Sequence, residues 1–175
     1  MILHRIVCLV RCSQATVKGF GAAKTRQSIR MYTAFKKSQS PLVTSEWLSQ
    51  TIASKLPNLV VLDCSIPMPG EKRDCLAEFK EQHIPGAQFF GISQCSDKET
   101  DNSYMLCNPE IFAKHVGELG VSNNTKIVLY DANEKKGMFS SPRAWWMFRA
   151  FGHTDVLILD GGLLAWKSAG NVMSG

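Results

Sequence analysis

The chain beyond residue 40 alternates between short apolar runs and longer segments whose apolar residues recur at helical spacing. Continuous apolar runs are typical of strands that are covered on both faces. The sequence predicts such strands at 59–62, 126–130 and 156–159, with a shorter strand at 87–90. Helices are predicted at 45–52, 74–82, 109–119, 141–151 and 163–169. This alternation indicates an α/β domain with a mainly parallel central sheet and helices on both faces.

Two of these helices begin with residues that helix termini favour. Thr44 precedes the helix at 45–52 and is expected to cap it. Asn108 is expected to cap the helix at 109–119, because Pro109 suits the first helical position and Glu110 suits the first turn. Gly120 follows that helix, as glycine commonly does at a helix end.

Positive charge is concentrated at the N-terminus. The first 45 residues hold eight Lys and Arg residues and no acid, whereas residues 46–175 hold twelve against fifteen acids, a balance of about −3. An acid-free, basic, Ser/Thr-containing N-terminus is typical of mitochondrial presequences. We therefore expect residues 1–40 to direct the protein to the mitochondrial matrix and residues 41–175 to form the folded domain. A basic tail without an address is the alternative.

The same composition argues against two classes of partner. The folded part is acidic, so it offers no electrostatic case for binding nucleic acid. No apolar stretch approaches the roughly 18 residues of a membrane span. The six cysteines form no CxxC pair and no Cys/His cluster at zinc spacing. We expect reduced thiols, no metal and no cofactor.

The segment His83-Ile84-Pro85-Gly86-Ala87 is the most specific short motif. Proline fixes the chain direction and glycine permits a turn, so the motif is interpreted first as scaffolding at the entry to a strand. A functional interpretation competes with it. Asp74 lies nine positions before His83, and an Asp–His pair at a domain edge orients or relays a proton. The alternative for Asp74 is a helix cap.

The loop from Asp131 to Ser141 leads from a predicted buried strand to the start of a helix. Free N–H groups and the helix dipole make such a place suited to anions. Asp131 supplies a permanent anion there, and we expect its carboxylate to accept the amide hydrogens of its own loop. The cysteine and arginine that cysteine-based phosphatases place six positions apart are missing, because Asp131 and Gly137 occupy those positions.

Three segments together resemble a rhodanese domain, and the resemblance spans roughly residues 45–174. They are 79–87, which contains the His-Ile-Pro-Gly motif, 130–143, which contains the loop, and 160–166, which begins Asp-Gly-Gly. In catalytic members of that family the loop opens with a sulfur-carrying cysteine. Asp131 stands there in this chain. Because a carboxylate forms no persulfide, the resemblance implies that this domain does not itself carry sulfur.

The resemblance is nearest to the N-terminal, non-catalytic half of mitochondrial tandem-rhodanese sulfurtransferases, and Gln94-Cys95-Ser96-Asp97 looks nearer their 3-mercaptopyruvate branch than their thiosulfate branch. Such proteins pass sulfur through a cysteine persulfide to cyanide, a small thiol or thioredoxin. The catalytic cysteine belongs to a second rhodanese domain, absent from these residues, and the active site lies between the domains. Asp74 and His83 are then candidate contributors to that site. The alternative is a free-standing inactive module that binds a partner or an anion.

Residues 144–153 form a strongly apolar stretch that includes Trp145, Trp146 and Phe148. Core packing explains one apolar face of a helix, but this segment is apolar nearly all round. The excess predicts a second packed partner, and hence a part of this stretch that is exposed in the isolated chain.

Overall fold

The computed structural model describes residues 40–100, 104–133 and 138–175. The expected presequence therefore lies outside the described residues, apart from its last position. Within the described ranges, no helix combines the length and apolar character that crossing a bilayer requires.

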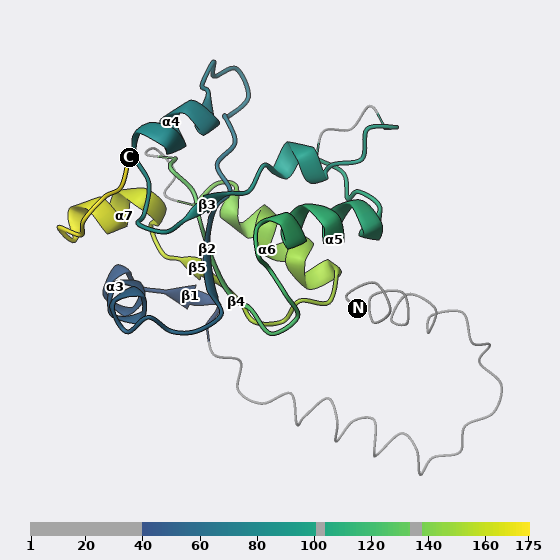
Figure 1. The fold of residues 1–175 in the computed structure, drawn as a ribbon. Coiled ribbons are helices and arrows are strands. Elements are labelled where there is room, and N and C mark those ends of the chain that lie inside the picture. The colour runs from purple at the N-terminus through teal and green to yellow at the C-terminus, as the bar shows by residue number, and fades with distance from the viewer. Residues whose placement is uncertain (1–39, 101–103, 134–137) are drawn as a thin grey trace, which may run out of the picture.

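A central sheet of five parallel strands organises the fold, in the order β1-β5-β4-β2-β3 (Figure 1). The strands are β1 (Leu42–Val43), β2 (Leu59–Asp63), β3 (Gln88–Phe89), β4 (Lys126–Tyr130) and β5 (Val156–Leu159). The longest pairing joins β2 to β4 and runs from Leu59 opposite Lys126 to Asp63 opposite Tyr130. The predicted α/β class with a parallel sheet is confirmed.

Helices cover both faces of the sheet. They are α3 (Ser45–Ala53), α4 (Cys75–Glu81), η2 (Ile92–Cys95, a 3-10 turn), α5 (Pro109–Glu118), α6 (Ser141–Ala150) and α7 (Gly162–Ser168). One buried cluster joins α5 and α6 to the sheet through Phe112 and Phe148, and a second joins α3 and α7 to the other face through Leu48 and Trp166. Figure 1 shows α5 and α6 on one side of the strands and α3 and α7 on the other.

The predicted caps form as expected. The Thr44 side chain accepts from the Trp47 amide at 3.2 Å, and Asn108 Oδ1 accepts from the Glu110 amide at 2.8 Å. Gly120 ends α5 with a φ of +73°, a conformation that residues with a Cβ resist.

Core packing accounts for most of the apolar character of α6. Ala144, Met147 and Phe148 are buried, and the half-buried Trp145 donates from its indole Nε1 to the Val156 carbonyl at 3.0 Å. The charged residue Arg149 is exposed, so the helix is not buried all round. The large apolar side chain that is exposed within α6 is Trp146, which is 45% exposed. The predicted exposed part is therefore one indole ring.

Candidate functional site

Two buried acidic residues lie at the carboxyl ends of neighbouring parallel strands. Asp63 ends β2, and its partner Tyr130 ends β4, so Asp131 lies one position beyond on the neighbouring strand. Open α/β sheets place their ligand sites outside the carboxyl ends of the strands. Asp63 and Asp131 are each 1% exposed, which is unusual for carboxylates.

The Asp131 carboxylate fills the loop that leads into α6. Its Oδ2 accepts from the backbone amides of Phe139 at 2.8 Å, Ser140 at 2.9 Å and Ser141 at 2.9 Å. The Ser141 hydroxyl donates to the same oxygen at 3.0 Å, and the Asn133 amide donates to Oδ1 at 3.3 Å. The expectation that the carboxylate accepts the amides of its own loop is confirmed.

This arrangement gives α6 its N-terminal cap. Ser140 occupies the cap position, but its side chain makes no capping hydrogen bond. Asp131 instead satisfies the first free amides of the helix from a distant position in the chain, and its negative charge lies at the positive end of the helix dipole. The anion site predicted from the sequence is thus occupied by a residue of the protein.

Ser65 links the loops that follow β2 and β4. Its hydroxyl donates to Asp63 Oδ1 and accepts from the Ala132 amide at 2.8 Å. The Ser65 amide donates to the same Asp63 oxygen at 2.9 Å. Burial nevertheless raises the pKa of Asp63 from its ordinary value of 3.8 to about 6, and the nearby Asp131 charge adds to that shift. Two buried carboxylates thus lie at one edge of the sheet.

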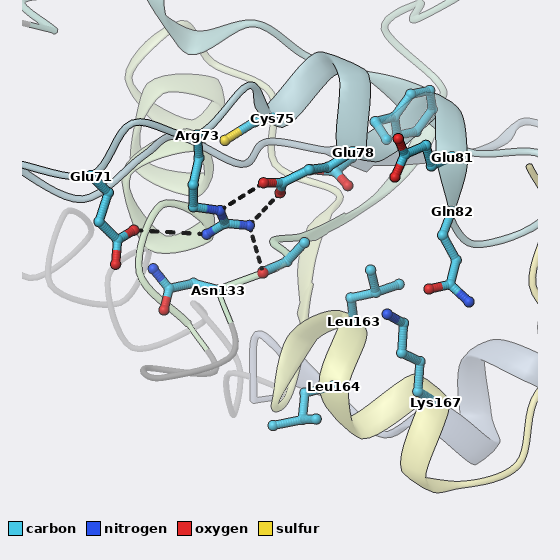
Figure 2. A pocket seen from close by; sticks show the side chains of 13 residues that line it. Glu71, Arg73, Cys75, Glu78, Glu81, Gln82, Asn133, Leu163, Leu164 and Lys167 are labelled. Atoms are coloured by element: carbon cyan, nitrogen blue, oxygen red, sulfur yellow. Dashed lines mark hydrogen bonds and ion pairs between the residues drawn. The ribbon is translucent and has the colours of Figure 1, made fainter.

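A cavity of about 400 Å³ opens beside this edge, and Figure 2 shows its walls. Residues of α4 and the segment before it form one wall, and Leu163, Leu164 and Lys167 of α7 form another. The cavity also touches Asp63, Ala132 and Asn133, so it reaches the ends of both central strands.

Arg73 lines the cavity, and hydrogen bonds fix its guanidinium. Its Nε donates to Glu78 Oε1 at 3.0 Å, and Nη2 contacts the second oxygen of the same carboxylate. Nη2 also donates to the Ala132 carbonyl at 3.2 Å, which ties α4 to the loop after β4 (Figure 2). The bidentate bond to Glu78 raises the pKa of Arg73 above its ordinary value. The guanidinium therefore stays charged and fixed.

Asp74 and His83 do not form a pair. Asp74 caps α4 through bonds from the amides of Leu76 at 3.1 Å and Ala77 at 3.0 Å. The His83 ring stacks on Phe79 with 4.4 Å between centroids, and its Nδ1 lies 2.7 Å from the Phe79 carbonyl. The two residues flank a seven-residue helix, which separates them by about 10 Å. The interpretation of Asp74 and His83 as a pair is wrong, and the competing interpretation of Asp74 as a helix cap is confirmed.

The scaffolding interpretation of residues 83–87 agrees with the backbone. Gly86 has a φ of +76°, and the Ala87 amide donates to the Ile84 carbonyl at 2.9 Å, so the segment turns the chain into β3. His83 also forms an antiparallel bridge with Ser174. Its backbone thus holds the C-terminal segment against the domain.

None of the four described cysteines is an activated thiolate at this edge. All four are free and buried, as expected for reduced thiols. Cys64, next to Asp63, donates from Sγ to the Tyr130 carbonyl at 3.0 Å, and burial raises its pKa well above the ordinary value. Burial also raises the pKa of Cys75, which lines the cavity. Among the residues that the structure describes, no cluster of His, Cys, Asp and Glu suits a metal ion.

Comparison with known families matches residues 44–169 to the model of the rhodanese-like domain. The chain belongs to this family. It is 50% identical over 132 residues to thiosulfate sulfurtransferase of Gallus gallus, covering 74% of this chain and 45% of that protein. It is 46% identical over 127 residues to 3-mercaptopyruvate sulfurtransferase of Homo sapiens, covering 71% and 42%.

A solved structure supports the same assignment. The crystal structure of SseA from Escherichia coli, described as showing the rhodanese fold of 3-mercaptopyruvate sulfotransferases, superposes with a TM-score of 0.71 at 36% identity. The match covers 78% of this chain and 50% of that one. The rhodanese domain therefore spans about half the length of its relatives. Because relatives of both names match at similar identity, these comparisons do not separate the two branches.

Sequence reasoning missed two contributors to the site. Ser65 lies 67 positions from Ala132, and Arg73 lies 59 positions from it, so neither contact follows from local spacing. Their place in the chain was the one indication, because both residues follow the strand predicted at 59–62. The carboxyl end of that strand lies at the same edge of the sheet as Asp131.

Proposed function

We propose that this rhodanese domain is the non-catalytic half of a sulfurtransferase that moves sulfane sulfur from 3-mercaptopyruvate, or from thiosulfate, to a thiol or cyanide. The observation that carries the proposal is the Asp131 carboxylate in the amide cradle before α6. In the family this loop is where catalytic members hold the sulfur-carrying cysteine. A carboxylate in its place keeps the anion and removes the nucleophilic sulfur.

The chemistry then belongs to a cysteine of a second rhodanese domain in the same polypeptide. Its thiolate attacks the donor sulfur and forms a persulfide, and the electron pair of the broken bond leaves with pyruvate enolate or with sulfite. An acceptor thiolate, from a small thiol or thioredoxin, next attacks the outer sulfur and releases the cysteine. No cofactor is needed for either step.

This half contributes structure and one wall of the inter-domain site. The cavity beside α4 and α7 offers a charged surface in which Arg73 is fixed by Glu78 and Ala132. Asp74 and His83, at the two ends of α4, remain proposed contributors to that wall. The resemblance of residues 94–97 to the 3-mercaptopyruvate branch favours 3-mercaptopyruvate as the donor.

The isolated chain is expected to show no sulfurtransferase activity. Purified protein would be assayed for thiocyanate formation from cyanide with either donor, beside the Gallus gallus enzyme as the positive control. Asp131→Cys is not expected to restore efficient catalysis by itself, because the rest of the loop lacks the catalytic sequence of the family. Turnover of the unmodified chain well above the blank would overturn the proposed role of Asp131.

We propose a mitochondrial location on the basis of residues 1–40, which hold basic residues and no acid. A fluorescent protein that carries these residues is expected to enter mitochondria and to be shortened on import. A matched fusion tests whether the positive charge is required, because it replaces Arg5, Arg11, Arg26 and Arg30 by the neutral residue Gln. A diffuse, full-length signal from the unmodified fusion would contradict the proposal.

A second rhodanese domain is expected to stabilise this one, which distinguishes the proposal from a free-standing module. Binding to the folded state alone raises apparent stability by mass action. We expect thermal melts of this chain to shift upward by several degrees when it is fused to the part of the Gallus gallus enzyme that it does not cover. A monomeric chain with a high, cooperative melt that gains nothing from the fusion would favour the free-standing module.

A further inference from the structure

Cys95 and Cys107 lie across a short antiparallel contact on the α5 side of the sheet. Ser96 and Leu106 form an isolated antiparallel bridge, and the Asp97 amide donates to the Met105 carbonyl at 3.0 Å. The next positions outward along this bridge are Cys95 and Cys107. Residues that oppose each other in an antiparallel pair have Cα atoms about 4.5–5.5 Å apart, within the roughly 4.4–6.8 Å that a disulfide spans.

The two thiols also lie close enough for each to shift the pKa of the other. The cysteines are 0% and 5% exposed within the buried cluster that contains Phe90 and Phe112. Cys64 differs, because its Sγ donates to a backbone carbonyl instead. Among the described cysteines, only Cys95 and Cys107 have another thiol among the groups that shift their pKa.

Burial disfavours the thiolate form of both cysteines. It raises the pKa of Cys95 to about 12 and raises the pKa of Cys107 as well. A protonated thiol is a poor nucleophile, so the pair reacts only when a small oxidant reaches it and one proton leaves. Cys107 is the more accessible of the two and is the expected first attacker.

We propose that Cys95 and Cys107 form a dithiol modification site that a two-electron oxidant of the peroxide class converts into an intramolecular disulfide. The Cys107 thiolate attacks one peroxide oxygen, becomes a sulfenic acid and releases hydroxide. The Cys95 thiolate then attacks that sulfur, and a second hydroxide leaves. The two released protons and two hydroxides give two waters, and the two sulfurs supply the two electrons that reduce the peroxide.

The disulfide would join the end of η2 to the residue before the cap of α5. That segment also reaches α6, because the Arg143 guanidinium donates to the Tyr104 carbonyl. Oxidation would therefore restrain the contact between η2 and the start of α5, and with it the contact between Tyr104 and Arg143 of α6. It would leave the hydrogen bonds of the Asp131 carboxylate unchanged. The inference does not depend on sulfur transfer by this protein.

The experiment compares untreated and peroxide-treated chain by peptide mapping. Each sample is alkylated under denaturing conditions and cut with trypsin, which cleaves after Lys98 and so separates the two cysteines. We expect a peptide pair linked through Cys95 and Cys107 that is at least about tenfold more abundant after peroxide and is lost on reduction. Independent alkylation of Cys95 and Cys107 after peroxide treatment, without a linked pair, would overturn the proposal.

Two variants sharpen the result. Cys107→Ser is expected to abolish the linked pair, whereas Cys75→Ser, a buried cysteine of α4 outside this contact, is expected to leave it unchanged. A linked pair in which Cys95 is joined to Cys64 or Cys75 instead would contradict the assignment. The map of the unmodified chain decides the question even where a variant folds poorly.

Discussion

Asp131→Ala is expected to lower the free energy of unfolding by about 4 kcal/mol or more, a large fraction of the roughly 5–15 kcal/mol that stabilises a domain. The substitution removes the acceptor of the Phe139, Ser140 and Ser141 amides. Each buried donor left without a partner costs about 1–3 kcal/mol, and the cap of α6 is lost with them. Urea unfolding followed by tryptophan fluorescence measures the change.

Two further variants test whether the charge or the acceptor matters. Asp131→Asn keeps the size and one oxygen but places an NH₂ group among donors, so we expect an intermediate loss of about 2–3 kcal/mol. Asp160→Asn is the control, because Asp160 is an exposed carboxylate that follows β5 at the same edge. It is expected to change stability by no more than about 0.5 kcal/mol. Equal effects of Asp131→Ala and Asp160→Asn would contradict the role of the cradle.

Asp63 is expected to make the domain less stable as the pH rises from about 4 to about 7. Burial raises its pKa from 3.8 to about 6, so the folded state binds the proton more tightly than the unfolded chain does. The stabilising contribution of the protonated carboxyl is fully present below pH 3.8 and is lost as the pH rises through 6. A shift of this size corresponds to about 3 kcal/mol.

Comparison with Asp63→Asn isolates this contribution from those of the other carboxylates. Asparagine is neutral at every pH and keeps an oxygen for the bonds from Ser65. We expect the stability of the wild type relative to the variant to fall by about 3 kcal/mol between pH 4 and pH 7. Asp155→Asn, which removes a surface ion pair with Lys126, is the control and should show no such trend. A difference between wild type and Asp63→Asn that is independent of pH would contradict the prediction.

The parts of the fold that the sequence predicts are those with a strong local cause. The apolar runs of β2 and β4 stand out because both strands are central and largely buried. The strand β1 was missed because it has only two residues and no Pro-Gly turn precedes it, whereas the equally short β3 follows one. Its position follows from bonds to distant residues, such as the Ile158 amide to the Pro41 carbonyl at 2.7 Å. The 3-10 turn η2 has no apolar periodicity to reveal it.

The site divides in the same way. The Asp131 cradle was predictable because strand, loop and helix start follow one another in the chain, and the resemblance marked the position. The Asp74–His83 pair was wrong because each side chain has a local partner: Asp74 accepts the amides of Leu76 and Ala77, and the His83 ring stacks on Phe79. The Ser65 bridge depends on the register of β2 against β4, and no single segment encodes that register.

In the proposed sulfurtransferase, the occupied cradle has a consequence for how this domain behaves. A loop that carries sulfur must accommodate a thiolate and then a longer persulfide, so its geometry has to serve two occupants. The loop before α6 has a single occupant, the Asp131 carboxylate. The loop therefore needs only one geometry, and its sequence can be selected for stability alone. In the proposed enzyme, such a domain is a rigid partner against which the catalytic domain is positioned.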